Sequence, residues 1–98
     1  MAGSIAERLS ELGIELPTAP RPVAAYVGYV RQGDLLFVSG QLPMVDGKVA
    51  VTGLLGRDLG MEEGAAAARI CAINLVAQAN AACGGDLDAV TRVVKLSG

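Results

Sequence analysis

YVGYVRQGDLLFVSGQLPMVDG, residues 26–47, is the stretch that decides the fold. The β-branched and aromatic side chains at its start predict a first strand over residues 24–30. The sequence RQGD at residues 31–34 predicts a turn, because its glycine can adopt a positive φ. The uninterrupted apolar run LLFV at residues 35–38 predicts a second strand that is covered on both faces.

The rest of the predicted fold follows from the residues downstream. The dipeptide DG at residues 46–47 predicts a hairpin that leads into a third strand over residues 48–52. Residues 61–83 are rich in alanine, contain no proline and predict a long helix that the glycines at residues 84–85 end. Residues 88–97 alternate in polarity and predict a fourth strand. The order β-β-β-α-β predicts an α+β fold, with a sheet packed on one long helix.

The first residues predict a short amphipathic helix that precedes this fold. Residues 4–13 place isoleucine and leucines on one face, with Ser4 as the predicted N-cap. Glu7 lies three positions later, which is the capping-box arrangement, and Gly13 is expected to end the helix.

Three prolines within residues 17–22 predict an extended connector, because proline lacks a backbone N–H and fixes φ. The predicted division is therefore an N-terminal extension and connector over residues 1–21, and the domain proper over residues 22–98.

Composition excludes several classes of function. The net charge is −2 and the basic residues are scattered, which argues against nucleic acid as the main partner. No apolar run approaches the ~20 residues that a membrane span needs, and charges interrupt the N-terminus where a secretion signal would be apolar. A cytoplasmic location is the default expectation.

The chemistry-bearing residues are few. Histidine is absent and there is no CxxC pair, so neither a metal site nor a cofactor is expected. Cys71 and Cys83 lie twelve residues apart in the predicted helix, a separation of about 18 Å that is beyond disulfide reach. We interpret both cysteines as small buried apolar residues.

The pattern also predicts self-association. One long helix can cover only one face of the sheet, whereas LLFV at residues 35–38 requires cover on both. Burying the second face, at about 25 cal/mol per Å² of apolar surface, requires another subunit or a further segment.

GDLLFVSGQLP at residues 33–43, the DG turn and the long segment EEGAAAARICAINLVAQANAACGGDLDAVTRVVKLSG at residues 62–98 together closely resemble the YjgF-like family. This family includes the reactive intermediate deaminases (RidA) and the endoribonuclease L-PSP proteins. The resemblance runs from about residue 22 onward, and the N-terminal extension is most similar to a longer, less characterised branch. It implies a chorismate-mutase-like fold and a homotrimer with ligand clefts between subunits.

The resemblance also implies a function and a site. The leading expectation is a hydrolase that converts reactive enamines or imines, such as 2-aminoacrylate, to 2-oxo acids and ammonia. A non-catalytic ligand-binding or regulatory trimer is the alternative, and an endoribonuclease-type translation inhibitor is a third. By position, Tyr26 matches a tyrosine that lines the cleft. Ser39 and Gly40 match a pair whose hydroxyl and N–H face the ligand, which would be a small 2-imino or 2-oxo acid.

Two further expectations concern these residues and the end of the chain. Without the resemblance, Tyr26 would be interpreted as a core aromatic residue and Ser39-Gly40 as a turn that ends a strand.

The family pattern continues with a helix and two strands that carry an arginine and a glutamate of the site. Neither Arg69 nor Arg92 matches that arginine by position, so the expected domain is truncated after its fourth strand and its active site is incomplete.

Overall fold

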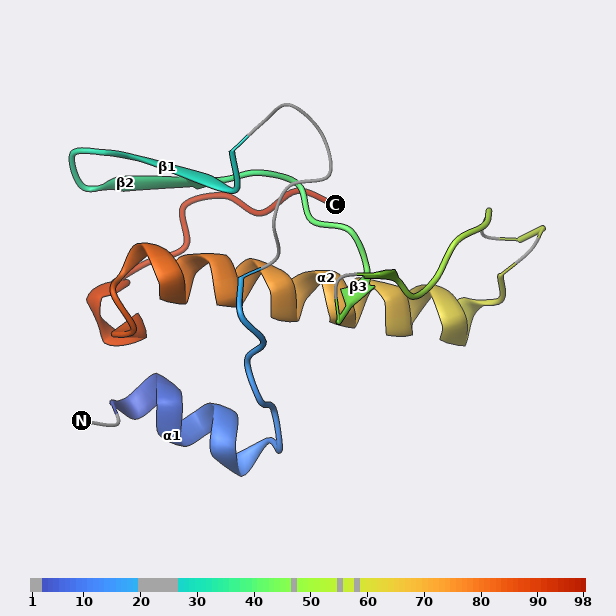
Figure 1. Cartoon of the computed structure of the whole chain (residues 1–98), viewed down its shortest axis with the longest axis horizontal. Helices are drawn as coiled ribbons and strands as arrows, with labels where there is room; N and C mark the ends of the chain where they lie inside the picture. The colour runs from blue at the N-terminus through green and yellow to red at the C-terminus, as the bar shows by residue number, and fades with distance from the viewer. Residues whose placement is uncertain (1–2, 20–26, 47, 55, 58) are drawn as a thin grey trace.

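Helix α2 (Met61–Ala82) is the element against which strands β1 (Tyr29–Gln32), β2 (Leu35–Val38) and β3 (Met44–Val45) pack (Figure 1). The computed structural model describes residues 3–19, 27–46, 48–54, 56–57 and 59–98. In the view of Figure 1 the β1–β2 hairpin lies on one side of α2 and helix α1 on the other. The elements, in chain order, are α1 (Ser4–Glu11), β1 (Tyr29–Gln32), β2 (Leu35–Val38), β3 (Met44–Val45), β4 (Lys48–Val49), α2 (Met61–Ala82) and the 3₁₀ helix η1 (Leu87–Ala89).

Both predicted hairpins are present. Strands β1 and β2 are antiparallel, and Gln32 pairs with Leu35 across a two-residue turn in which Gly33 has φ +58°. A positive φ at the first turn position is the arrangement that glycine favours in two-residue hairpins. Strands β3 and β4 are also antiparallel, and Asp46 begins their turn with φ +51°.

The predicted third strand is shorter than expected, because β4 ends at Val49. One further backbone bond joins the amide of Ala50 to the carbonyl of Pro43 at 2.8 Å. Pro43 has no N–H to return a bond, and the chain folds back there through a bond of 2.8 Å between the amide of Met44 and the carbonyl of Leu42. The ladder therefore stops. The predicted start of the first strand, residues 24–26, lies outside the described residues.

Helix α1 ends as predicted but begins differently. Its N-cap is Gly3 and not Ser4, and no side chain of the N-cap residue takes part. The predicted capping box of Ser4 and Glu7 was therefore wrong. The first two amides of the helix, those of Ser4 and Ile5, donate to the carboxylate of Asp88 instead. At the other end Gly13 has φ +70° and the amide of Ile14 donates to the carbonyl of Leu9 at 2.9 Å, which closes a Schellman motif.

Helix α2 has the predicted limits to within one residue. The Glu63 side chain accepts a hydrogen bond from the amide of Gly60 at 3.3 Å and so satisfies one donor at the N-terminus. At the C-terminus Gly84 has φ +65°, and the amide of Gly85 donates to the carbonyl of Asn80 at 2.9 Å. The helix thus ends in a second Schellman motif.

The predicted fourth strand, residues 88–97, was wrong. Leu87–Ala89 form η1, where the side chain of Asp86 accepts a hydrogen bond from the amide of Asp88, and residues 90–98 belong to no helix or strand. Alternating polarity forms a strand only where a neighbouring backbone supplies hydrogen bonds, and within the described residues no strand pairs with this segment. Its apolar side chains are exposed, Leu96 to 76%.

The interior is small. Among the described residues, Ala77 and Leu87 are the buried apolar residues, and Asn74 and Gln78 are the buried polar ones. No helix in the described part combines the length and the apolar character that crossing a membrane requires.

Strand β2 explains why the interior is small. Leu36 and Val38 are half-buried, whereas Leu35 and Phe37, on the opposite face, are 49% and 59% exposed. Because β1 and β2 contact α2, the chain covers one face of this hairpin and leaves the other open. This is the α+β arrangement of a small sheet and a long helix that the sequence predicted.

Candidate functional site

Ser39 directly follows β2 and is fixed by two hydrogen bonds to the chain before β1. Its amide donates to the carbonyl of Gly28 at 3.0 Å, and its hydroxyl donates to the carbonyl of Val27 at 2.5 Å. The side chain is half-buried. Because the hydroxyl proton is engaged, the oxygen of Ser39 presents its lone pairs as acceptors to any further partner.

Gly40 is the exposed residue of the predicted pair. A Cβ atom built on Gly40 would meet no atom within 4 Å, so the space beside this residue is open. The amide of Gly40 donates to no acceptor in the part of the chain that the structure describes. An accessible backbone N–H next to a fixed hydroxyl can bind a carbonyl or carboxylate oxygen of a ligand.

The loop that carries Ser39 and Gly40 contains two internal hydrogen bonds. The side chain of Gln41 donates from Nε2 to the carbonyl of Ser39 at 2.9 Å. Three residues later, the bond between Met44 and Leu42 closes a tight turn around Pro43. We call residues 39–44 the SGQLPM loop.

The side-chain amides of two buried residues of α2 lie against this loop and against Gly28, the residue before β1. Asn74, 1% exposed, donates from Nδ2 to the carbonyls of Leu42 at 3.0 Å and Met44 at 3.1 Å. Gln78, 3% exposed, lies so close to Gly28 that a Cβ on this glycine would be 2.6 Å from its Oε1. Both residues were missed as site residues, although two amides one turn apart in an apolar helix are a recognisable signal.

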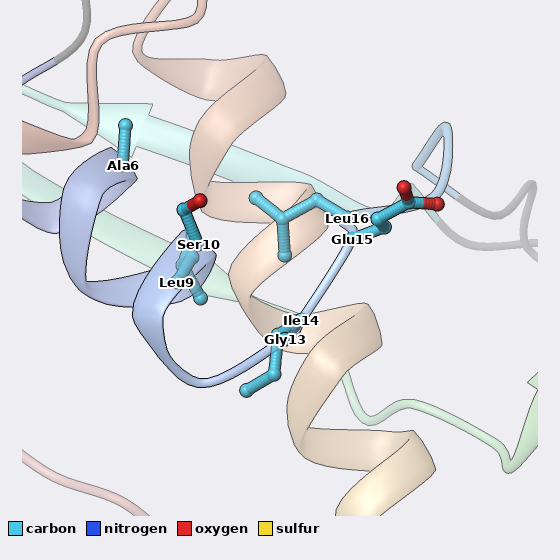
Figure 2. A pocket seen from close by; sticks show the side chains of 7 residues that line it. All are labelled: Ala6, Leu9, Ser10, Gly13, Ile14, Glu15 and Leu16. Atoms are coloured by element: carbon cyan, nitrogen blue, oxygen red, sulfur yellow. The ribbon is translucent and has the colours of Figure 1, made fainter.

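The third predicted residue, Tyr26, lies outside the described residues, so the structure brings together only Ser39 and Gly40. A shallow groove elsewhere involves neither of them (Figure 2). It lies between α1 and the segment that follows, and its lining residues are Ala6, Leu9, Ser10, Gly13, Ile14, Glu15 and Leu16.

The cysteines and the described acidic residues form no metal-binding cluster. Cys71 and Cys83 are free and half-buried, and burial raises the pKa of the Cys71 thiol, which favours its protonated form near neutral pH. Within the described ranges no group of three or more potential ligands could hold a metal ion.

The chain thus packs short strands against one long helix and carries a Ser-Gly loop directly after β2. The family model described as "YjgF/chorismate mutase-like, putative endoribonuclease" matches residues 6–98. The chain therefore belongs to the YjgF/chorismate mutase-like family, and the resemblance and fold class inferred from the sequence are confirmed.

The chain is also similar to individual proteins. Protein TCP17 of Trypanosoma cruzi is 52% identical over 96 residues, which are 98% of this chain and 59% of that protein. A crystal structure of a protein with unknown function from Agrobacterium tumefaciens is 53% identical with a TM-score of 0.72, over 83% of this chain and 48% of the other.

A crystal structure described as a putative endoribonuclease, from Shewanella oneidensis MR-1, is 38% identical. Its TM-score is 0.77, over 84% of this chain and 54% of the other. The chain thus spans between about half and three fifths of the length of these relatives.

Proposed function

We propose that the SGQLPM loop is this chain's contribution to a binding site for small 2-imino and 2-oxo acids, at which reactive enamines or imines are hydrolysed. One observation carries the proposal: exposed Gly40, whose amide donates to no described acceptor, directly follows Ser39, whose hydroxyl is fixed, on a loop anchored to the buried side of α2. Such an arrangement presents polar groups without a metal ion.

The reaction assigns a simple task to these groups. Water adds to the C=N carbon of the imine to form a carbinolamine, and the C–N bond then breaks to give the 2-oxo acid and ammonia. In this proposal the N–H of Gly40 binds an oxygen of the substrate, and the oxygen of Ser39 accepts a hydrogen bond from the attacking water and so orients it, while the proton that the water loses passes to the nitrogen that leaves as ammonia. Fixed groups of this kind stabilise charge that develops in the transition state.

The site is proposed to lie between copies of the chain in a homotrimer. The exposed outer face of β2, with Leu35 and Phe37, supports this assembly, because an apolar sheet face gains stability when another subunit covers it. Tyr26 remains a predicted ligand-lining residue. The proposed location of the whole protein is the cytoplasm.

The test measures release of 2-oxo acid from freshly generated 2-iminobutanoate by the natural full-length protein. We expect acceleration over buffer, and a loss of about 100-fold in kcat for Ser39→Ala, the size of loss typical for a removed transition-state contact. Ser97→Ala, at an exposed position outside the loop, is the matched control. If the full-length protein binds 2-oxobutanoate but accelerates nothing, the non-catalytic binding trimer replaces the enzyme.

RNA cleavage is the second candidate function, favoured by the descriptions of the family model and of the Shewanella relative. The net charge of −2 counts against it, because phosphate binding requires concentrated positive charge. The absence of histidine also counts against it, because histidine is the commonest general base. Cleavage of a single-stranded RNA, abolished in Ser39→Ala and unaccompanied by imine hydrolysis, would establish this function over the deaminase.

A further inference from the structure

Asn74 and Gln78 are the two buried polar side chains that the described part of the chain contains. They lie four residues apart, on one face of a helix whose neighbouring residues are alanine, isoleucine, leucine and valine. A buried amide costs free energy unless its hydrogen bonds are satisfied, so its partners show what it holds in place.

The partners of Asn74 are two carbonyls of the SGQLPM loop. Nδ2 donates one hydrogen bond to Leu42 at 3.0 Å and one to Met44 at 3.1 Å. Both protons of this amide nitrogen are thereby used. The two carbonyls lie on either side of Pro43, which has no N–H of its own to take part in a ladder.

This attachment is close to the residues of the proposed site. Leu42 is two residues after Gly40, and the Gln41 side chain joins the loop back to the carbonyl of Ser39. The other end of the loop is also supported by α2, because Ser39 bonds to Gly28 and Gly28 is in contact with Gln78. The two buried amides thus support the two ends of one loop.

We propose that Asn74 is a positioning residue, which holds the SGQLPM loop in the conformation that presents Ser39 and Gly40 to the ligand. Its effect on catalysis rests on the proposed function, whereas its effect on the loop does not. A displacement of about 1 Å at a site can cost about 100-fold in rate, so the catalytic effect of losing these two bonds is large enough to measure.

Asn74→Asp is the decisive variant because it keeps the shape of the side chain and removes the donor. An ionised carboxylate would face two carbonyl oxygens, whereas its protonated form can donate one hydrogen bond. The loop residues 42–44 carry no titratable side chain, and the titratable residue of α2 within one turn is Cys71. In Asn74→Asp, protection of the loop and kcat should therefore recover as the pH falls.

Asn74→Leu, which is branched at the same atom, larger and uncharged, is the second variant and should show no recovery with pH. Asn80→Asp, the same substitution later in α2 and without a bond to the loop, is the control. All are made in the natural full-length protein.

The first measurement is amide hydrogen exchange without substrate, each variant compared with the unmodified protein at the same pH. At weakly alkaline pH, Asn74→Asp and Asn74→Leu should accelerate exchange of the hydrogen-bonded amides of Ser39, Met44 and Ala50 about tenfold or more relative to residues 30–37. Asn80→Asp should leave this ratio unchanged. Unchanged exchange in both Asn74 variants overturns the proposal.

The second measurement is the pH profile of imine hydrolysis. We expect kcat to fall about 10- to 100-fold in Asn74→Asp at alkaline pH and to recover partly on acidification, with a flat deficit in Asn74→Leu. Altered exchange with unaltered kcat would also refute a positioning role. If the unmodified protein lacks the activity while exchange responds as expected, the proposed function fails and the assignment of Asn74 to the loop stands.

Discussion

The carboxylate of Asp88 caps helix α1 from the far end of the described chain, 84 residues from Ser4. Oδ2 accepts a hydrogen bond from the amide of Ser4 at 2.8 Å, and Oδ1 accepts one from the amide of Ile5 at 3.0 Å. The first amides of a helix lack internal partners and carry partial positive charge, which a carboxylate satisfies. No residue of α1 is buried, so this contact with η1 is central to how α1 is held.

Asp88→Ala should release α1 while leaving α2 folded. The substitution removes the acceptors of two backbone amides and of the Ser4 hydroxyl, which bonds to Oδ1 at 3.2 Å. Hydrogen exchange of residues 4–11 should become markedly faster, and exchange within α2 should not change. Asp34→Ala, in the exposed turn of the first hairpin, is the control; equal protection of α1 in both variants would contradict the role of Asp88.

Acid should release the same helix. The amides of Ile5 and Ser4 hold the pKa of Asp88 below its ordinary value. The contact therefore stabilises the folded state above the ordinary carboxyl pKa, and this contribution is lost as the pH falls through the lower pKa of the folded state. The amide resonances of Ser4 and Ile5 should report this loss in an NMR titration from neutral pH downward. In Asp88→Asn, which has no titrating carboxylate, the transition should be absent.

Gly28→Ala should destabilise the protein by about 1–3 kcal/mol, the usual cost of overpacking a filled site. The new Cβ would lie 2.6 Å from Oε1 and 3.0 Å from Cδ of Gln78, a side chain that is 3% exposed and has little room to move. Gly40→Ala is the matched control for stability, because the space beside it is open, and it should change the free energy of unfolding by less than about 0.5 kcal/mol. Urea unfolding curves of the two variants provide the comparison.

Phe37→Asp should disrupt assembly of the full-length protein. The side chain is 59% exposed within one chain, so the charge costs little there, but it would be buried and unpaired if another subunit covers β2. Met61→Asp, at a position 90% exposed on the first turn of α2, is the control and should not change the mass. Native mass measurement decides the question: a trimer that persists in Phe37→Asp would exclude this face from the interface.

Features specified by neighbouring residues could be predicted from the sequence. The turn at Gly33, the turn that begins at Asp46 and the end of α2 before Gly84 each depend on a backbone conformation that the local residue favours. The family, too, could be recognised from the SGQLP stretch and the helix that follows.

Features that depend on contacts between distant segments could not be predicted. Asp88 caps a helix 84 residues away, and Asn74 bonds to carbonyls 30 and 32 residues away, so no local pattern indicates either partner. The strand predicted at residues 88–97 is the opposite case: the local pattern was present, but the distant contact was not. Alternating polarity indicates a strand only where a neighbouring backbone is present to pair with it. For the candidate site, Ser39 and Gly40 could be selected, but the bond from the Ser39 hydroxyl to Val27 could not.

The spacing of Asn74 and Gln78 constrains how related chains can vary in length. Successive side chains in a helix are rotated by about 100° around its axis. One residue inserted between Asn74 and Gln78 would therefore place them on different faces of α2. One end of the loop would then lose its support from α2. Insertions and deletions among homologous chains should therefore collect in residues 50–60, before α2 begins, and be absent from the single turn between positions 74 and 78.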